Sequence, residues 1–213
     1  MKKAFLCCVA LLVLAGCQSA YYEAAEKVGY HKRDIMVDRV EGSRDAQEEA
    51  QEQFQSALEQ LGELTNFDGG DLEDIYDDMA DEYEDSVEAA AEVTERIDAV
   101  EDVAQALFKE WQEEIAQYSN ARFKADSQAK LAATQKQYSA MMAAMRKSEA
   151  KMTPVLTALN DKVLYLKHNL NARAVASLQV EFESIENDIG ALIEEMRNSI
   201  EVSDAFIESL QQG

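Results

Sequence analysis

Residues that interrupt helices are scarce in this sequence, which has one proline and eight glycines among 213 residues. Proline and glycine are the residues that most often end, bend or kink a helix, so their scarcity permits very long helices. The single proline, Pro154, suits either the first position of a new helix or a kink in a continuing one. The composition therefore predicts an all-α protein with few turns.

Residues for common enzyme and metal chemistry are also few. The chain has two histidines, His31 and His168, and its three cysteines all lie within the first 17 residues. This set disfavours a zinc site, and the sequence shows no nucleophile–base pair and no phosphate-binding glycine loop. The acidic residues around Gly69-Gly70 lack the ligand spacing of a calcium loop. We therefore expect no enzyme activity, no metal and no cofactor.

Positive charge is in short supply, with 20 Lys and Arg against 42 Asp and Glu and a net charge of −22. Such an acidic chain repels phosphate backbones, so nucleic acid is not an expected partner. Positive and negative side chains are unevenly distributed along the chain. Residues 41–120 hold 26 acidic and 3 basic side chains, a net of −23, whereas residues 121–173 hold 10 basic and 3 acidic side chains, a net of +7. This change predicts oppositely charged helices side by side in an antiparallel arrangement.

The most regular stretch of the sequence runs from Leu72 to Tyr118. Apolar residues recur there at alternating steps of four and three, which is the pattern of one helix face packed on a partner helix. The expected seam is Leu72, Tyr76, Met79, Tyr83, Ser86, Ala90, Val93, Ile97, Val100, Ala104, Leu107, Trp111, Glu114 and Tyr118. A helix of this length would reach about 70 Å at about 1.5 Å per residue. A softer seam from Met36 to Leu64 includes polar Ser43 and Gln47.

Turn signals divide the chain into segments of similar length, residues 22–64, 71–118, 121–167 and 171–210. Gly69-Gly70 is the clearest turn, and Ser119-Asn120 is a second candidate because both residues commonly flank helices. We therefore predict an elongated antiparallel bundle of three to four long helices with coiled-coil-like packing. The seams would serve a bundle within one chain or between chains, so a homo-oligomer stays open.

The segment from Lys167 to Arg173 breaks the phase of the apolar seam. It fits a third turn, a stutter in one long helix, or a polar layer inside the bundle. We expect His168, Asn169 and Asn171 to make polar contacts that fix the register of the helices. Methionines upstream, Met141, Met145 and Met152, recur at helical spacing and are expected to fill the core.

The N-terminus has the features of a secretion signal, with Lys2 and Lys3 followed by an apolar run at residues 4–14. Leu14-Ala15-Gly16-Cys17 then resembles a bacterial lipobox, whose cysteine is acylated and becomes the mature N-terminus; an ordinary signal peptide is the alternative. We expect a signal peptide at 1–16, a lipidated tether and helix start at 17–35, and one elongated helical domain at 36–213. The lipoprotein resemblance also implies the outer membrane, because Gln18 rather than aspartate follows the cysteine.

Over nearly its full length, the chain is similar to a family of acidic, helical bacterial lipoproteins of unknown function. The resemblance rests on Cys-Gln-Ser-Ala-Tyr-Tyr from Cys17, Glu-Lys-Val-Gly-Tyr-His-Lys-Arg-Asp-Ile from Glu26, and Leu-Lys-His-Asn-Leu-Asn-Ala-Arg-Ala from Leu166. It implies a lipid-anchored helical body and no activity. The leading hypothesis is a scaffold or spacer that faces the periplasm and binds an envelope protein along its side. The alternative is an acidic module that binds divalent cations or cationic peptides.

Overall fold

The computed structural model describes residues 31–66 and 72–212, and this part of the chain folds into four long helices. They are α2 (Lys32–Thr65), α3 (Leu72–Gln117), α4 (Ala121–Lys167) and α5 (Ala172–Gln212). Helix α4, with 47 residues, would be about 70 Å long at about 1.5 Å per residue. The signal segment, Cys17 and the Gly69-Gly70 turn lie outside the described residues. Helix α2 begins before Met36, so the expected boundary at residue 36 falls inside a helix.

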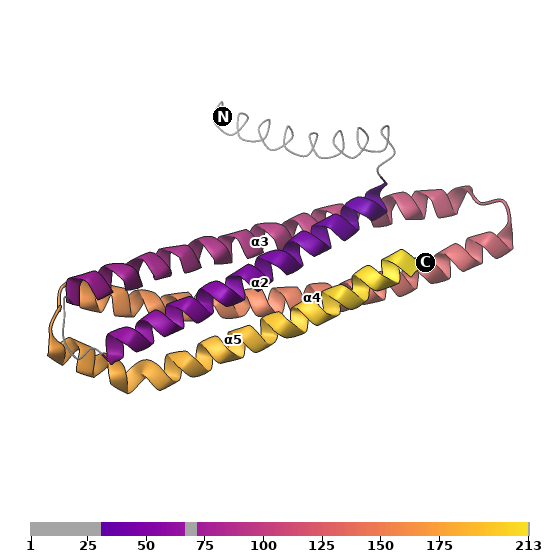
Figure 1. The fold of residues 1–213 in the computed structure, drawn as a ribbon. Coiled ribbons are helices and arrows are strands. Elements are labelled where there is room, and N and C mark those ends of the chain that lie inside the picture. The colour runs from indigo at the N-terminus through magenta and orange to yellow at the C-terminus, as the bar shows by residue number, and fades with distance from the viewer. Residues whose placement is uncertain (1–30, 67–71, 213) are drawn as a thin grey trace, which may run out of the picture.

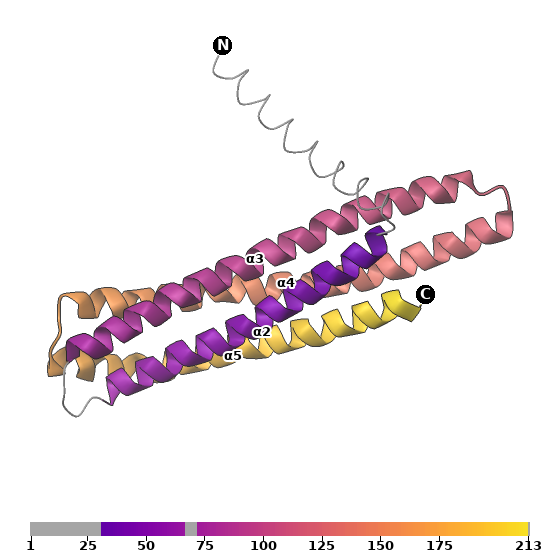
Figure 2. The same cartoon turned by 45° about the horizontal axis from the view of Figure 1, so that its top comes forward.

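The four helices pack side by side as an antiparallel bundle (Figures 1 and 2). Each helix contacts its two neighbours in the ring α2–α3–α4–α5, so α2 faces α4 across the core and α3 faces α5. We call the end where α2 begins, α3 turns into α4 and α5 finishes the proximal end. The opposite end, where α4 turns into α5, is the distal end. The predicted all-α antiparallel bundle of long helices is confirmed.

Two asparagines define the starts of α4 and α5. The side-chain oxygen of Asn120 accepts hydrogen bonds from the backbone N–H groups of Arg122 and Phe123 at 2.9 and 3.3 Å. The side-chain oxygen of Asn171 does the same for Arg173 and Ala174 at 3.1 and 3.2 Å. These bonds satisfy N–H groups that have no partner within the first helical turn. Pro154 lies inside the continuous helix α4 rather than at a helix start.

The turn between α4 and α5 corrects one expectation from the sequence. His168, Asn169 and Asn171 are all exposed in this turn, so they do not form a polar layer inside the bundle. Asn169 donates its side-chain amide to the carbonyl of Tyr165 at 2.8 Å, while Asn171 caps the next helix. The break in the apolar phase marks the end of a helix, because these short polar side chains bond to nearby backbone groups and compete with helix continuation.

The core consists of apolar side chains from all four helices, and it is closed within one chain. Met141, Met145 and Met152 are buried in it, as predicted. The predicted seam of α3 packs on the core from Leu72 to Trp111, with Leu107 and Trp111 partly buried, whereas Glu114 is exposed. Toward the proximal end Tyr118 is exposed, and the buried residues there are Val103, Phe108 and Ile115 instead.

Candidate interaction surfaces

A group of small polar side chains lies in the middle of the apolar core. We call Ser43, Gln47, Ser148, Ser199 and Ser203 the central polar layer; each is fully buried. The Ser148 hydroxyl of α4 donates to the side-chain oxygen of Gln47 at 3.1 Å and so joins α2 and α4 across the core. The Gln47 amide in turn donates to the Ser43 carbonyl at 3.2 Å. A buried polar contact of this kind favours one alignment of the helices over shifted ones.

Helix α5 contributes Ser199 and Ser203 to the same level of the bundle. Arg44, which follows Ser43 on α2, pairs with Asp204, which follows Ser203 on α5, at 3.4 Å. This ion pair holds Ser43 and Ser203 at the same level of the bundle. The Ser203 hydroxyl donates to the Ser199 carbonyl at 2.7 Å. The Ser199 hydroxyl has no hydrogen-bond partner within the described part of the chain. A buried hydroxyl without a partner costs free energy because it has lost its bonds to water.

We expect Ser199→Ala to raise the free energy of unfolding by up to about 1 kcal/mol, because it removes an unpartnered buried hydroxyl. Urea unfolding followed by circular dichroism would measure the change. Ser203→Ala is the matched control, since it removes an equally buried hydroxyl that does have a partner. The control should lower stability by about 0.5–1.5 kcal/mol. Equal losses in the two variants would contradict the difference in hydrogen bonding.

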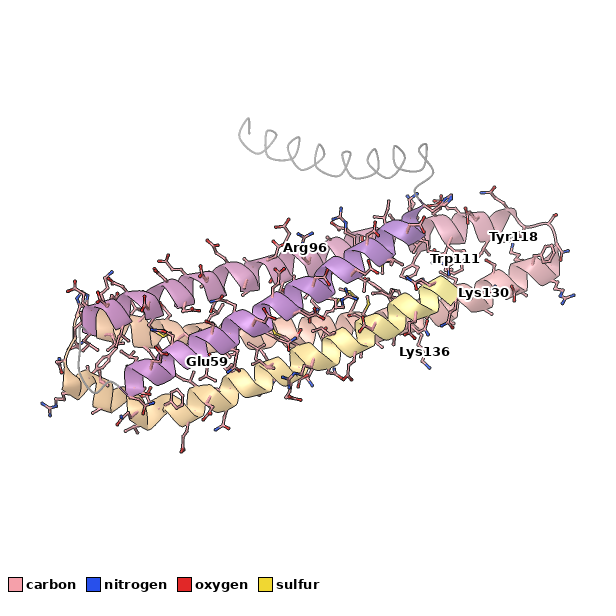
Figure 3. The ribbon with its side chains drawn as sticks, viewed as in Figure 1. Glu59, Arg96, Trp111, Tyr118, Lys130 and Lys136 are labelled. Carbon is pink, nitrogen blue, oxygen red and sulfur yellow. The ribbon has the colours of Figure 1, made fainter. Side chains whose placement is uncertain are left out.

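Charged side chains cover the long sides of the bundle and pair between neighbouring helices (Figure 3). Arg146 of α4 donates to Asp98 at 2.6 Å and to Glu101 at 2.8 Å, both on α3, and to Glu149 at 3.0 Å. Burial opposes the charge of Arg146, but its hydrogen bonds to the three carboxylates outweigh that effect and raise its pKa. The basic segment of the sequence thus lies beside an acidic helix, as its charge pattern predicted.

Replacing Arg146 by Met should lower the free energy of unfolding by about 1 kcal/mol, since exposed ion pairs contribute about 0–1 kcal/mol each and this one joins three carboxylates. The loss should shrink in high salt, which screens exposed charges. Arg96→Met is the matched control, because Arg96 pairs with Glu92 on its own helix at 2.5 Å. Its expected effect is about 0.2–0.5 kcal/mol. An Arg146→Met variant as stable as the Arg96→Met variant would show that the ion pairs between α3 and α4 add nothing.

The two acidic helices α2 and α3 pack closely against each other, although their like charges oppose it. Neutral donors mediate part of this contact. The Glu82 carboxylate of α3 accepts hydrogen bonds from the Gln53 amide at 2.7 Å and from the Ser56 hydroxyl at 2.9 Å, both on α2. Hydrogen bonds to a charged group are stronger than those between neutral groups. Glutamine and serine on α2 therefore allow two acidic helices to be neighbours.

The acidic side chains of the described helices are potential metal ligands because of their number. Over residues 31–66 and 72–212, no three His, Cys, Asp or Glu side chains come together as candidate metal ligands. None of the described helices combines the length and the apolar character needed to cross a bilayer.

The exposed large apolar side chains gather at the two ends of the rod. Leu164, Tyr165, Leu170 and Val180 lie at the distal end, and we call them the distal apolar patch. Tyr118 and Phe123 lie at the proximal end, while Val87 is the one exposed large apolar side chain between the ends of the described bundle. Val180 is 84% exposed, which is unusual for a valine on a packed helix. Most of the exposed large apolar side chains of the described bundle therefore lie at its ends, while Val87, Ala90, Met152 and Leu156 line a shallow groove on the side between α3 and α4.

Neither the central polar layer nor the two apolar ends was predicted from the sequence. Ser43 and Gln47 did stand out as polar positions in the seam of the first helix. Continuing the last seam beyond Met196 in steps of three and four reaches Ser199 and Ser203, so comparing the seams position by position could have found the layer. The exposed ends had no comparable signal, because apolar residues in a heptad pattern look the same whether or not a partner helix covers them.

The described part of the chain is an elongated antiparallel four-helix bundle with a polar layer in its core and apolar ends. A family model described as a protein of unknown function (DUF2959) matches residues 21–210. The chain belongs to this family. No curated protein matches the chain, and no solved structure does. The resemblance to a helical family of unknown function is thus confirmed, while the lipobox and the lipid anchor stay predictions.

Proposed function

We propose that this protein is a lipid-anchored spacer of the bacterial cell envelope that holds a protein partner at its distal end. The observation that carries the proposal is the distribution of exposed apolar side chains, with four of them in the distal apolar patch and charged residues along the sides. Large apolar side chains exposed near one another at one end of a rod favour a protein interaction site there. The proposal therefore moves the expected contact from the side of the rod to its end.

The two ends of the rod have separate tasks in this proposal. The start of α2, from which the chain leads back to Cys17, lies at the proximal end. An acyl anchor on Cys17 would therefore hold the proximal end near the outer membrane, facing the periplasm, and leave the distal end about 70 Å away at about 1.5 Å per residue of α4. Cys-linked acyl chains supply firm attachment when more than one is present. The proposal assigns no reaction, metal or cofactor to the chain.

The expected partner is an envelope protein with an apolar surface bordered by acidic residues. The distal apolar patch is flanked by exposed Lys167 and Arg173, which would face such a border. Apolar burial would supply most of the affinity, so binding should persist in high salt. The basic flank would instead favour the correct orientation of the partner.

Photo-crosslinking in living cells tests the distal contact. A photoreactive amino acid in place of Val180 should give one adduct of defined mass that persists in high salt. The matched control carries the same amino acid in place of Val87, an exposed apolar position between the two ends, and should give no such adduct. A defined adduct only from position 87 would contradict the proposal. Tight, stoichiometric uptake of a divalent cation in calorimetry would favour the acidic binding module instead.

A further inference from the structure

The α3–α4 hairpin extends beyond the other two helices at the proximal end (Figures 1 and 2). Lys32, the first residue of α2, pairs with Glu110 of α3 at 2.5 Å. The neighbouring Arg33 donates to the carbonyl of Leu210 near the end of α5. The beginning of α2 and the end of α5 therefore lie close to the level of Glu110. Helix α3 continues for seven residues to Gln117, which adds about 10 Å at about 1.5 Å per residue.

Apolar contacts and a hydrogen bond hold this extension together. The Trp111 indole N–H of α3 donates to the Ser127 hydroxyl of α4 at 2.8 Å. Ile115 of α3 and Leu131 of α4 are both buried. The hairpin therefore projects as a supported pair of helices rather than as a single helix. We call residues 115–125 at its end the tip.

The tip exposes two aromatic side chains. Tyr118, just beyond α3, is 45% exposed (Figure 3). Phe123, in the first turn of α4, is 59% exposed. Exposed aromatic side chains at the extremity of a rod have no role in the core of the bundle. Tyrosine suits the boundary between lipid headgroups and hydrocarbon, because its ring is apolar and its hydroxyl is polar.

The charge of the tip differs from that of the body. Between Glu114 and Asp126 the chain carries Arg122 and Lys124 and no acidic residue. By contrast, residues 41–120 as a whole hold 26 acidic and 3 basic side chains. Basic side chains are attracted to an anionic lipid surface, whereas the acidic body is repelled by the same surface. The tip therefore combines exposed aromatic and basic side chains at the end of the rod nearer the proposed anchor, whereas the distal end, which also carries basic residues, lies about 70 Å away at about 1.5 Å per residue of α4.

We propose that the tip rests against the surface of the lipid bilayer, with Tyr118 and Phe123 at headgroup level and Arg122 and Lys124 near lipid phosphates. This inference rests on the proposed anchor at Cys17. His31 follows Cys17 by fourteen positions, enough to span about 21 Å as a helix or about 46 Å when extended. Either distance exceeds the projection of the tip beyond the start of α2. The anchor therefore leaves the tip free to reach the membrane.

Contact at two points has a mechanical consequence for the spacer. An acyl anchor alone would let the rod lie or swing at any angle. A second contact at the tip restricts the tilt of the bundle and keeps the acidic sides away from the lipid. The distal apolar patch would then be held at a defined distance from the bilayer, which is the property that a spacer requires.

Fluorescence quenching in proteoliposomes tests the contact. The full lipidated protein carries Ala121→Cys, labelled with an environment-sensitive fluorophore, in vesicles of phosphatidylethanolamine and phosphatidylglycerol containing a headgroup-proximal spin-labelled lipid. The matched probe sits at Ser184→Cys, an exposed position in the distal half of the rod. We expect severalfold stronger quenching at position 121 than at position 184. Adding Tyr118→Ser and Phe123→Ser to the first probe should reduce its quenching, whereas Val87→Ser should not.

Flotation of the same vesicles separates the two proposals. If the protein floats with the vesicles but the probe at 121 is quenched no more than that at 184, the tip does not touch the bilayer and the inference is wrong, while the anchor stands. Failure of the lipidated protein to float would overturn the anchor and the inference with it. Quenching that the two serine substitutions leave unchanged would also overturn the role of the aromatic side chains.

Discussion

Replacing Phe54 with alanine is expected to lower the free energy of unfolding by about 3–5 kcal/mol. Phe54 lies in α2 and is completely buried in the core shared by the four helices. Its removal takes apolar area out of the interior and leaves a cavity, which the surrounding helices fill only in part. Urea unfolding followed by far-ultraviolet circular dichroism measures the change through the midpoint and slope of the transition.

Val180→Ala provides the comparison for this experiment. Val180 is a helical apolar residue of α5 that is 84% exposed, so its truncation leaves no cavity. Its effect should stay within about 0.5 kcal/mol. If the Phe54→Ala variant were as stable as the Val180→Ala variant, α2 would not pack into the bundle as described. A smaller loss with an unchanged slope would instead indicate that the neighbouring helices close the cavity.

The helices themselves could be predicted from the sequence because apolar residues recur at helical spacing in each long segment and the segment ends at recognisable turn residues. Asn120 illustrates why the second end could be predicted without glycine or proline, since its side chain caps α4. The end of the apolar seam on α3 could not be predicted. Trp111 and Tyr118 keep the heptad spacing of the seam. Neither α2 nor α5 extends to the tip, however, so the last turns of α3 have only α4 to pack against. The packing face therefore shifts toward Phe108 and Ile115.

The candidate sites were harder to predict because they depend on pairing between helices. Gln47 was visible as a polar residue in an apolar seam, but its partner Ser148 lies on a helix across the core. The apolar seam of a helix shows which face of that helix each residue occupies. It does not show which residues of two neighbouring helices lie at the same level along the bundle. For His168 and its neighbours the interpretation failed in the opposite direction. This polar segment suggested a layer inside the bundle, but it is an exposed turn. Polarity alone does not distinguish these two environments.

Cys17→Ser is expected to abolish lipid attachment. Cys17 is the cysteine of Leu14-Ala15-Gly16-Cys17, and serine lacks the thiol to which the first lipid group would be joined. Because each buried methylene of an acyl chain contributes about 0.8 kcal/mol, loss of the chains removes nearly all of the proposed membrane affinity of the mature protein. Metabolic labelling with a radioactive fatty acid should give no labelled protein, and the mature form should disappear because lipoprotein processing follows lipid attachment.

A double variant, Cys7→Ser with Cys8→Ser, controls for the loss of cysteine as such. Both residues lie in the segment that processing before Cys17 would remove, so this variant should be labelled, processed and membrane-bound like the unaltered protein. The proposed anchor would be wrong if Cys17→Ser still gave a membrane-bound protein of mature size. In that case an ordinary signal peptide and another means of attachment would account for the N-terminus, and the tip of the α3–α4 hairpin would become the first candidate for that attachment.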